Sequence, residues 1–308
     1  MRHARVLLTT AGRKSYLARQ LGASRIAGCI VATDLDGGSP IRGLVDAFET
    51  VPPTADTKAF VEAIQRICLR YEIDCVLPQN DRDLLPLADA RGAFEKGGIR
   101  VAGVDAATVE VVADKLRLSQ WLTANGFEAP ETWLDYPAHA DEYAAFVEKA
   151  RFGQGSEGLA FHDCPPASGP APGNVVQRRI PGDEYNLDIL RDAGGEVVAM
   201  SVKRKLTMEH GSTARAVSVR DDELEDLAVR LARALGVFGS IDVDLILGPD
   251  GPVVLDVNPR MGGGFPFTAT YFPAYVDALL AVCTGATVPV RGADYEAGIE
   301  IHREYSFQ

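Results

Sequence analysis

Apolar runs alternate with helical patterns through the first third of the chain. Three short apolar runs predict β-strands, at residues 5–10, 26–34 and 74–78. The stretches that follow them predict a loop and helix at residues 12–21, and helices at 53–71 and 81–94. In the second stretch Phe60, Ile64 and Ile67 recur at helical spacing. Strands that alternate with helices indicate a parallel sheet with helices on both faces.

The carboxyl ends of these predicted strands carry charged and polar residues. Ligands of parallel sheets bind beyond such ends. Gly12-Arg13-Lys14 places two cations in a strand-to-helix turn, where a helix N-terminus also favours anions. The turn therefore suits an anionic substrate, or it is simply solvated. Asp81 follows another strand end and either contacts substrate or caps the next helix.

The rest of the chain mixes strands and helices in an α+β pattern. The first domain boundary is predicted near residues 106–113, and a helix opens at Asp114 and Lys115. Residues 142–149 predict a helix that runs into a strand. Further strands are predicted at residues 175–177 and 196–205, a turn that leads into the next strand at 180–188, and a helix at 221–235. The runs 240–247 and 253–257 predict a hairpin around Gly248-Pro-Asp-Gly251.

A glycine-rich turn lies in the middle of the chain. Gly153, Gly155 and Gly158 have the GxGxxG spacing. A dinucleotide-binding fold would place that spacing after the first strand. Here it is flanked by Lys149 and Arg151 instead, which favours a loop whose N–H groups fold over phosphates. A plain hairpin turn is the alternative.

The predicted hairpin concentrates oxygen ligands on one face. Successive strand residues point to opposite faces, so Asp242 and Asp244 share a face, as do Asp256 and Asn258. Pairing of the two strands lets Asp244, Asp256 and Asn258 converge on one or two Mg²⁺ ions, which prefer oxygen ligands. The alternative is an acidic outer face in water.

The residues after the hairpin suit an anion. Pro259 ends the strand ladder because it has no N–H. Arg260 offers a planar fork for phosphate or carboxylate. The three glycines at 262–264 leave the backbone free to approach a ligand closely.

Composition and charge limit the kinds of partner that the chain can bind. The 308 residues include 31 Lys/Arg and 43 Asp/Glu, for a net charge of −12. Nucleic-acid binding rests on Lys/Arg neutralising phosphates, so we expect no nucleic-acid partner. The sequence contains no run of about 18 apolar residues, so we expect no membrane span. The five cysteines are scattered, without a CxxC pair, and indicate free thiols in a reducing, cytoplasmic location.

The order of these motifs resembles the ATP-grasp superfamily, and most of all enzymes similar to the large subunit of carbamoyl-phosphate synthase. The resemblance covers roughly residues 6–280, and its most specific segment is Asp256-Val-Asn-Pro-Arg-Met-Gly-Gly263. It implies α/β plus α+β architecture. An N-terminal parallel-sheet (pre-ATP-grasp) domain at 1–112 would precede a two-lobed ATP-grasp domain at 113–308. The lobe with the glycine-rich loop would span about 113–180, and the lobe with the metal site about 181–308.

The resemblance also implies roles for particular residues. Those that would contact ATP are Lys115, Lys149, Gly155, Ser156, Gln177, Arg178, Ile180 and Glu184. Those that would bind metal are Asp244, Asp256 and Asn258. Arg260, Lys149 and Asn258 would be the catalytic residues, with Arg260 in contact with the transferred phosphoryl group or the acyl phosphate. This chain departs from the family in having Asp256 where Glu is usual, and Arg178 at the adenine hinge.

A basic cluster, Lys203-Arg204-Lys205, lies near a strand end. It either holds the substrate carboxylate or forms a solvated edge. With Arg13, Lys14 and Asp81, Lys203 and Arg204 complete the expected substrate contacts.

The function expected from the resemblance is an ATP-dependent carboxylate–amine ligase that forms an amide through an acyl phosphate, on amino-acid-like substrates. The alternatives are a carbamate or carboxylate kinase of carbamoyl-phosphate-synthase type, and a non-catalytic nucleotide-binding protein. The cofactors would be ATP and Mg²⁺ (or Mn²⁺), and the partners a small carboxylate and an amine. We expect no membrane partner, and the family suggests a homodimer.

Overall fold

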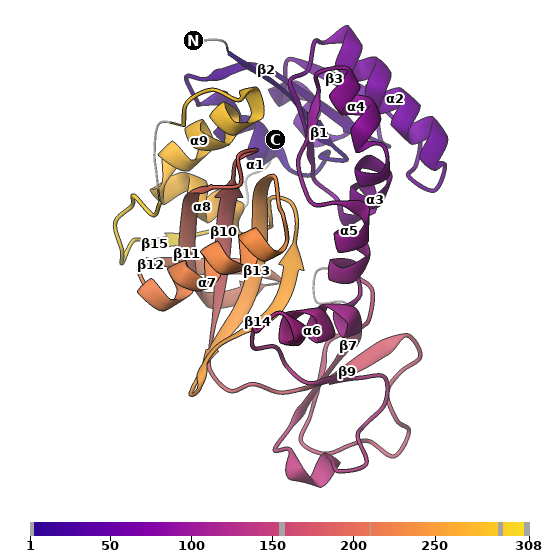
Figure 1. Ribbon diagram of the computed structural model, residues 1–308, viewed down its shortest axis with the longest axis vertical. Coiled ribbons are helices and arrows are strands. Elements are labelled where there is room, and N and C mark those ends of the chain that lie inside the picture. Colours follow the sequence, from indigo (N-terminus) through magenta and orange to yellow (C-terminus); the bar gives the residue numbers. More distant parts are fainter. Residues whose placement is uncertain (1–2, 154–157, 210, 289–291, 305–308) are drawn as a thin grey trace.

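The computed structural model describes residues 3–153, 158–209, 211–288 and 292–304 (Figure 1). Its first domain holds a five-stranded parallel sheet in the order β3-β2-β1-β4-β5. The strands are β1 (Ala4–Thr9), β2 (Ala27–Asp34), β3 (Ala47–Thr50), β4 (Cys75–Pro78) and β5 (Arg100–Val101). The helices are α1 (Ser15–Gly22), α2 (Thr57–Arg70), α3 (Asp81–Asp89) and α4 (Arg91–Lys96). The predicted parallel sheet is therefore confirmed.

The alternation of side chains along β1 builds two hydrophobic cores. Val6 and Leu8 pack in the core that includes Leu17 of α1. Leu7, on the opposite face, packs in the core that includes Phe60 of α2. Because successive strand residues point to opposite faces, one apolar run supports a helical layer on each side.

Two helices and a small sheet follow this domain. The helices are α5 (Ala106–Ala113) and α6 (Lys115–Ala124). The small antiparallel sheet has the order β6-β9-β7-β8 and forms the lower lobe in Figure 1. Its strands are β6 (Thr132–Trp133), β7 (Phe146–Ala150), β8 (Ala160–His162) and β9 (Asn174–Arg178).

The largest sheet is antiparallel, with the order β14-β13-β10-β11-β12-β15. Its strands are β10 (Asp183–Arg191), β11 (Val197–Glu209), β12 (Ser212–Val219), β13 (Gly239–Gly248), β14 (Gly251–Asn258) and β15 (Glu300–His302). The helix α7 (Asp222–Ala234) packs on one face, where Leu187 and Ile189 of β10 share its core. Asn186 and Asp188 therefore point to the other face, on which the polar site is built.

Two helices after β14 join the large sheet to the first domain. They are α8 (Phe265–Tyr271) and α9 (Pro273–Thr284). Leu279 and Leu280 of α9 share a core with Val6 and Leu8 of β1. Figure 1 shows α9 between the two sheets. This packing positions the carboxyl ends of the parallel strands beside the polar face of the large sheet.

Some local predictions were wrong. Residues 142–149 do not begin with a helix: a short 3-10 turn, Ala140–Glu142, precedes β7. The stretch 81–94 forms two helices, α3 and α4, which meet at Ala90. All five cysteines are free thiols, as expected. In the described part of the chain, no helix has the length and apolar character needed to cross a membrane.

Candidate active site

A cavity of about 1680 Å³ lies where the three parts of the molecule meet. Its walls come from the turn after β1 and from α1, from the small sheet, and from the polar face of the large sheet. Among the described residues that line it are ten Lys/Arg and five Asp/Glu side chains. A chain with a net charge of −12 thus concentrates positive charge in one cavity.

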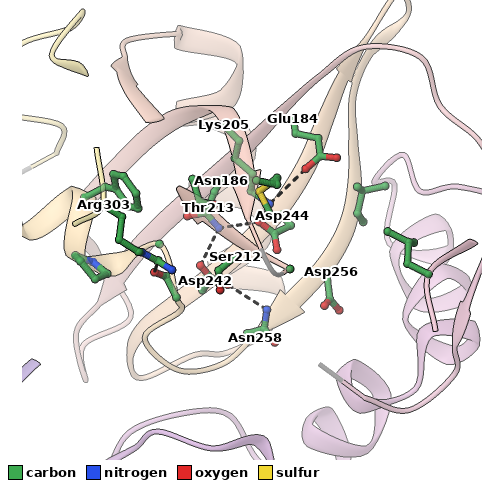
Figure 2. Close-up of a pocket in the computed structure, with 18 of the residues that line it drawn as sticks. Glu184, Asn186, Lys205, Ser212, Thr213, Asp242, Asp244, Asp256, Asn258 and Arg303 are labelled. Atoms are coloured by element: carbon green, nitrogen blue, oxygen red, sulfur yellow. Dashed lines mark hydrogen bonds and ion pairs between the residues drawn. The ribbon is translucent and has the colours of Figure 1, made fainter. Parts of the chain in front are cut away.

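The acidic wall of the cavity comes from the β13–β14 hairpin (Figure 2). Asp242 pairs across the hairpin with Asn258, and Asp244 pairs with Asp256. These four side chains share a face, as their alternation predicts. Asn186 of β10 links the row, since its Nδ2 donates to Asp242 Oδ1 at 2.7 Å and to Asp244 Oδ1 at 2.9 Å.

Two aspartates on β13 have different electrostatic surroundings. Burial, together with the nearby Asp244 carboxylate, raises the pKa of Asp242 to about 7. Burial alone would also raise the pKa of Asp244. The Lys205 ammonium, 2.7 Å from Asp244 Oδ1, outweighs it and lowers that pKa. Lys205 Nζ also lies 3.6 Å from Glu184 Oε2, so this one ammonium lies beside both carboxylates.

The predicted metal ligands provide a partial set of donors. Asp244, Asp256 and Asn258 contribute carboxylate and amide oxygens on one face, which is the donor chemistry Mg²⁺ prefers. Within the described ranges, no group of three or more His, Cys, Asp or Glu side chains is arranged to hold a metal by itself. Such a row suits an ion whose other ligands come from phosphates and water, and Asp244 would exchange its Lys205 partner for the ion.

Arg260 is buried at the end of the acidic row. Its Nε forms an ion pair with Asp81 Oδ1, and its Nη2 donates to Asn258 Oδ1 at 3.4 Å. Asp81 therefore orients this arginine and does not cap α3. The cap is Asn80, whose side chain accepts from the Arg82 N–H at 3.0 Å. The capping interpretation of Asp81 was wrong because the residue before it takes that position.

The glycines after Arg260 are required by packing inside the protein. A Cβ on Gly262 would lie 2.0 Å from Asp242 Oδ1. A Cβ on Gly264 would lie 2.9 Å from Lys203 Cε. Only Gly263 is exposed, and it lines the cavity. The close approach that the sequence suggested for a ligand is, at two of the three positions, an approach to neighbouring side chains.

Two lysines line the part of the cavity near the glycine-rich turn. Lys115 Nζ donates to the Gly153 carbonyl at 3.0 Å. Lys149 of β7 is largely buried, and burial lowers its pKa to about 8, against the opposing influence of Asp256. The predicted phosphate contacts Gly155 and Ser156 lie outside the described residues.

The predicted adenine hinge lies at the end of β9. Gln177 is buried and its Nε2 donates to Thr132 Oγ1 at 2.8 Å. Arg178 is exposed and lies 3.4 Å from Glu131. Ile180 is buried, and with Gln177, Arg178 and Glu184 it lines the cavity. The structure thus places these four side chains in the lining of one cavity.

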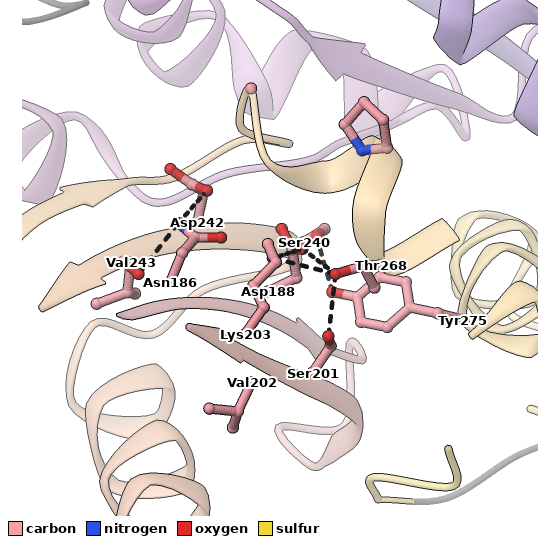
Figure 3. Close-up of polar contacts among 12 residues, drawn as sticks. Asn186, Asp188, Ser201, Val202, Lys203, Ser240, Asp242, Val243, Thr268 and Tyr275 are labelled. Carbon is pink, nitrogen blue, oxygen red and sulfur yellow. Dashed lines mark hydrogen bonds and ion pairs between the residues drawn. The ribbon is translucent and has the colours of Figure 1, made fainter. Parts of the chain in front are cut away.

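The basic cluster on β11 divides between the two faces of the sheet. Lys203 is not a surface substrate contact: it is 1% exposed, and its Nζ lies 2.6 Å from Asp188 Oδ2 and donates to Thr268 Oγ1 at 3.1 Å (Figure 3). Arg204 points to the opposite face, where it pairs with Asp183 at 3.0 Å. Neither side chain lines the cavity, so both predicted substrate contacts are corrected. Lys205, which was not among the predicted substrate contacts, is the member of the cluster that lines the cavity.

The turn after β1 contributes to the cavity as expected. Arg13 is exposed at its edge, and Lys14 lines its wall. Lys14 Nζ donates to the Gln79 carbonyl at 2.6 Å, and burial lowers the pKa of this lysine to about 7. No sequence pattern predicted Arg303, a further cation of the lining, because it follows a strand of only three residues.

Two protein-family models match successive parts of this chain. A family described as the PylC-like N-terminal domain matches residues 6–102, and one described as the ATP-grasp domain matches residues 112–264. Carbamoyl phosphate synthase large chain from Thermoplasma volcanium is 23% identical over 263 residues, which cover 72% of this chain and 24% of the relative. The chain thus spans about a quarter of that relative's length.

Solved structures share the fold. The biotin carboxylase domain dimer of Hydrogenobacter thermophilus 2-oxoglutarate carboxylase, in complex with MgADP, ADP and bicarbonate, matches with a TM-score of 0.71 and 14% identity. That match covers 97% of this chain and 74% of the other. The L-amino acid ligase from Bacillus licheniformis matches with a TM-score of 0.66 and 18% identity, over 92% of this chain and 75% of the ligase.

Proposed function

Because this chain belongs to the ATP-grasp superfamily, we propose that it is an ATP-dependent carboxylate–amine ligase that forms an amide through an acyl phosphate. The observation that carries the proposal is the cavity, where ten basic side chains face an acidic hairpin bearing Asp244, Asp256 and Asn258. This arrangement suits a polyphosphate and its cation. We propose amino-acid-like substrates for it.

The side chains of the cavity would divide the work of phosphoryl transfer. Lys115 and Lys149 would hold the phosphates of ATP, with Gln177, Arg178, Ile180 and Glu184 along the nucleoside. Asp244, Asp256 and Asn258 would hold Mg²⁺, which when bound neutralises the phosphate oxygens. Gly155 and Ser156 of the glycine-rich loop are proposed as further hydrogen-bond donors to the phosphates.

The chemistry needs no nucleophile from the protein. An oxygen of the substrate carboxylate would attack the γ-phosphorus, the bond from that phosphorus to the β-phosphate oxygen would break, and ADP would leave. The amine would then attack the acyl carbon, with loss of phosphate and a proton. Arg260, held by Asp81, would face the transferred phosphoryl group. Catalysis would thus rest on positioning and on charge complementarity.

A carbamate or carboxylate kinase is the second candidate. The similarity to a carbamoyl phosphate synthase large chain over 72% of this chain favours it. The kinase would release a phosphorylated acid as its product, whereas the ligase would release an amide and phosphate. Mass spectrometry of the product distinguishes the two.

The decisive experiment measures ADP release with MgATP across amino and dicarboxylic acids. We expect Asp256→Asn to lower ADP release by about 100-fold or more, because it removes a carboxylate aimed at the cation and phosphates. Asp250→Asn, at the exposed turn of the same hairpin, is the matched control and should keep its activity. ADP release that survives Asp256→Asn would contradict the assignment, and binding of ATP without turnover on any acid would favour a non-catalytic binding protein.

We also propose a cytoplasmic location and a homodimeric assembly. A dimer is described for the Hydrogenobacter domain of the same fold. Light scattering coupled to gel filtration tests the assembly, and a mass of 33.0 kDa would identify a monomer instead.

A further inference from the structure

The cavity has a second basic region away from the nucleotide lysines. It lies between α1 and the segment after β15, and its cations are Arg13, Lys14, Arg19 and Arg303. Lys115 and Lys149 come from α6 and β7 instead. The two groups of cations therefore belong to different walls of the cavity.

Arg303 is held in place before any ligand binds. Its backbone N–H donates to the Ala214 carbonyl at 2.8 Å, extending the β12–β15 pairing. Its Nη2 donates to the Gly263 carbonyl at 2.9 Å, and its Cζ lies 5.8 Å from the Phe267 ring centroid. A guanidinium fixed in this way keeps its other N–H groups free to bind and loses little entropy when it does.

The helix α1 presents a second arginine to the same space. Leu17 and Leu21 are buried in the core, whereas Tyr16 and Arg19 line the cavity. The side chain of Gln20 donates to the Pro266 carbonyl at 3.1 Å and ties α1 to α8. The helix that carries Arg19 is thus joined to α8, and Arg303 lies over the Phe267 ring of α8.

The cations of this region form no ion pair with the described part of the protein. Among the described residues, no ion pair includes Arg13, Lys14, Arg19 or Arg303. Lys14 donates to the backbone and side-chain oxygens of Gln79, which are uncharged. The acidic residue at this end of the lining is Glu304, next to Arg303. Burial lowers the pKa of Lys14 to about 7, and Asp81, Asp242 and Asp83 also act on this lysine, so the excess positive charge left for a ligand comes from the three arginines, against Glu304.

We propose that the substrate carries a second anionic group, separate from the carboxylate that is phosphorylated, and that Arg13, Arg19 and Arg303 bind it. The inference rests on the proposed ligase function and narrows its substrate class to small acids with two anionic groups. Arg260 would serve the reacting carboxylate, because it lies at the metal row. The second group, a carboxylate or a phosphate, would reach into the basic region, and Lys14 would add to its attraction.

Matched substrate pairs test the inference by turnover. Glutamate with glutamine compares a carboxylate with its neutral amide, and O-phosphoserine with serine compares a phosphate with a hydroxyl. We expect a preference of about 10-fold or more in kcat/KM for the charged member of one pair, as charge-assisted hydrogen bonds warrant. The pair that shows the preference identifies the anion. Equal use of charged and neutral members in both pairs overturns the inference while leaving the ligase intact.

Variants locate the contact. Arg19→Gln and Arg303→Gln should each raise KM for the charged substrate about 10-fold, with kcat and the KM for ATP changed less than about twofold. Arg66→Gln removes the same charge from α2, outside the cavity, and should leave every constant unchanged. If all three variants behave alike, the effect is one of total charge and the proposed subsite is wrong.

A binding measurement keeps the two proposals distinguishable. Calorimetry with glutamate, O-phosphoserine and their neutral partners, on the full chain with MgADP, needs no turnover. Preferential binding of one charged compound, lost in Arg303→Gln, supports the subsite even if no ADP is released, and then only the ligase proposal fails. No preference in the unmodified chain removes the subsite.

Discussion

Lys149 shows how burial changes the charge state of one side chain in the cavity. Removal of its ammonium from water lowers its pKa to about 8, the Lys115 charge acts in the same direction, and Asp256, Asp244 and Glu184 oppose them. The cation is therefore present below about pH 8 and is lost as the pH rises through that value. Because we propose that the charged form of Lys149 binds ATP, we expect the affinity for ATP to follow the same curve.

We expect the affinity of the free enzyme for MgATP to fall about 10-fold between pH 7 and pH 9.5, because a neutral amine forfeits a charge-assisted hydrogen bond of about 1.5–3 kcal/mol. Calorimetric titration across that range measures the curve. Lys149→Arg is the control, since an arginine stays charged throughout. The same inflection in that variant would show that another group titrates.

The division of Lys203, Arg204 and Lys205 marks what a sequence can predict for single residues. Alternation correctly predicts that Asp242 and Asp244 share a face, because both lie on one strand. It does not say which face of β11 meets the cavity and which part of that face is buried. Lys203 and Lys205 share a face, yet Asp188 and α8 enclose the first and the cavity takes the second. That difference arises from tertiary packing.

At the scale of elements, the buried pair of Lys203 and Asp188 joins β10 and β11 under α8. Both side chains are at most 1% exposed, and Thr268 of α8 donates to Asp188 Oδ2 at 2.5 Å. We expect Lys203→Met to lower the free energy of unfolding by about 3–5 kcal/mol, because it leaves an uncompensated buried carboxylate. Urea unfolding measures the change. The double variant Lys203→Met with Asp188→Leu should recover much of the loss, and no recovery would contradict this explanation.

The turn between β14 and α8 allows a comparison of two adjacent glycines. A Cβ at Gly262 would overlap Asp242, a buried side chain that Asn186 holds at 2.7 Å. We expect Gly262→Ala to cost about 1–3 kcal/mol of stability through overpacking. At Gly263 the nearest atom to an added Cβ is Ser212 Oγ at 4.0 Å, so Gly263→Ala should cost less than about 0.5 kcal/mol. Equal losses in thermal unfolding would show that Asp242 can move aside.

Some elements had no pattern to predict them. The helix α9 is apolar around its whole circumference, since eight of its twelve residues are buried. Such a helix lacks the amphipathic period on which a prediction depends. The strands β6, β8 and β15 have two or three residues each and gain their definition only from partner strands. By contrast, β1 and β2 are continuous apolar runs and α7 has a clear helical period, and all three were predicted within a few residues.

At the scale of the whole molecule, the order of motifs predicted more than any single motif. The ATP-grasp assignment is confirmed by family matches that cover residues 6–102 and 112–264, and the predicted fold class is confirmed with it. The expected nucleotide, ATP, agrees with the match to the ATP-grasp domain, and Mg²⁺ remains a proposal. The domain boundaries and the roles of individual site residues remain predictions. The second basic region could not be predicted from the sequence, because residues nearly 300 positions apart form it.

The distribution of charge over the molecule governs how ligands reach the cavity. The chain has a net charge of −12, yet ten basic and five acidic side chains line the cavity. A local positive field attracts polyphosphates to the cavity, whereas the acidic surface around it repels them. Salt weakens this attraction, because the Debye length falls from about 8 Å at 0.15 M to about 3 Å at 1 M ionic strength.

We therefore expect the KM for MgATP to rise about 10-fold or more between 50 mM and 500 mM NaCl, with little change in kcat, because screening acts on the approach and binding of the anion. Steady-state ADP release measures both constants. Adenosine is the control ligand, since it shares the base and ribose but has no phosphates, and its inhibition constant should stay within about twofold over the same range. If adenosine and ATP weaken in parallel, salt acts on the fold of the cavity, and the segregation of charge has no part in nucleotide capture.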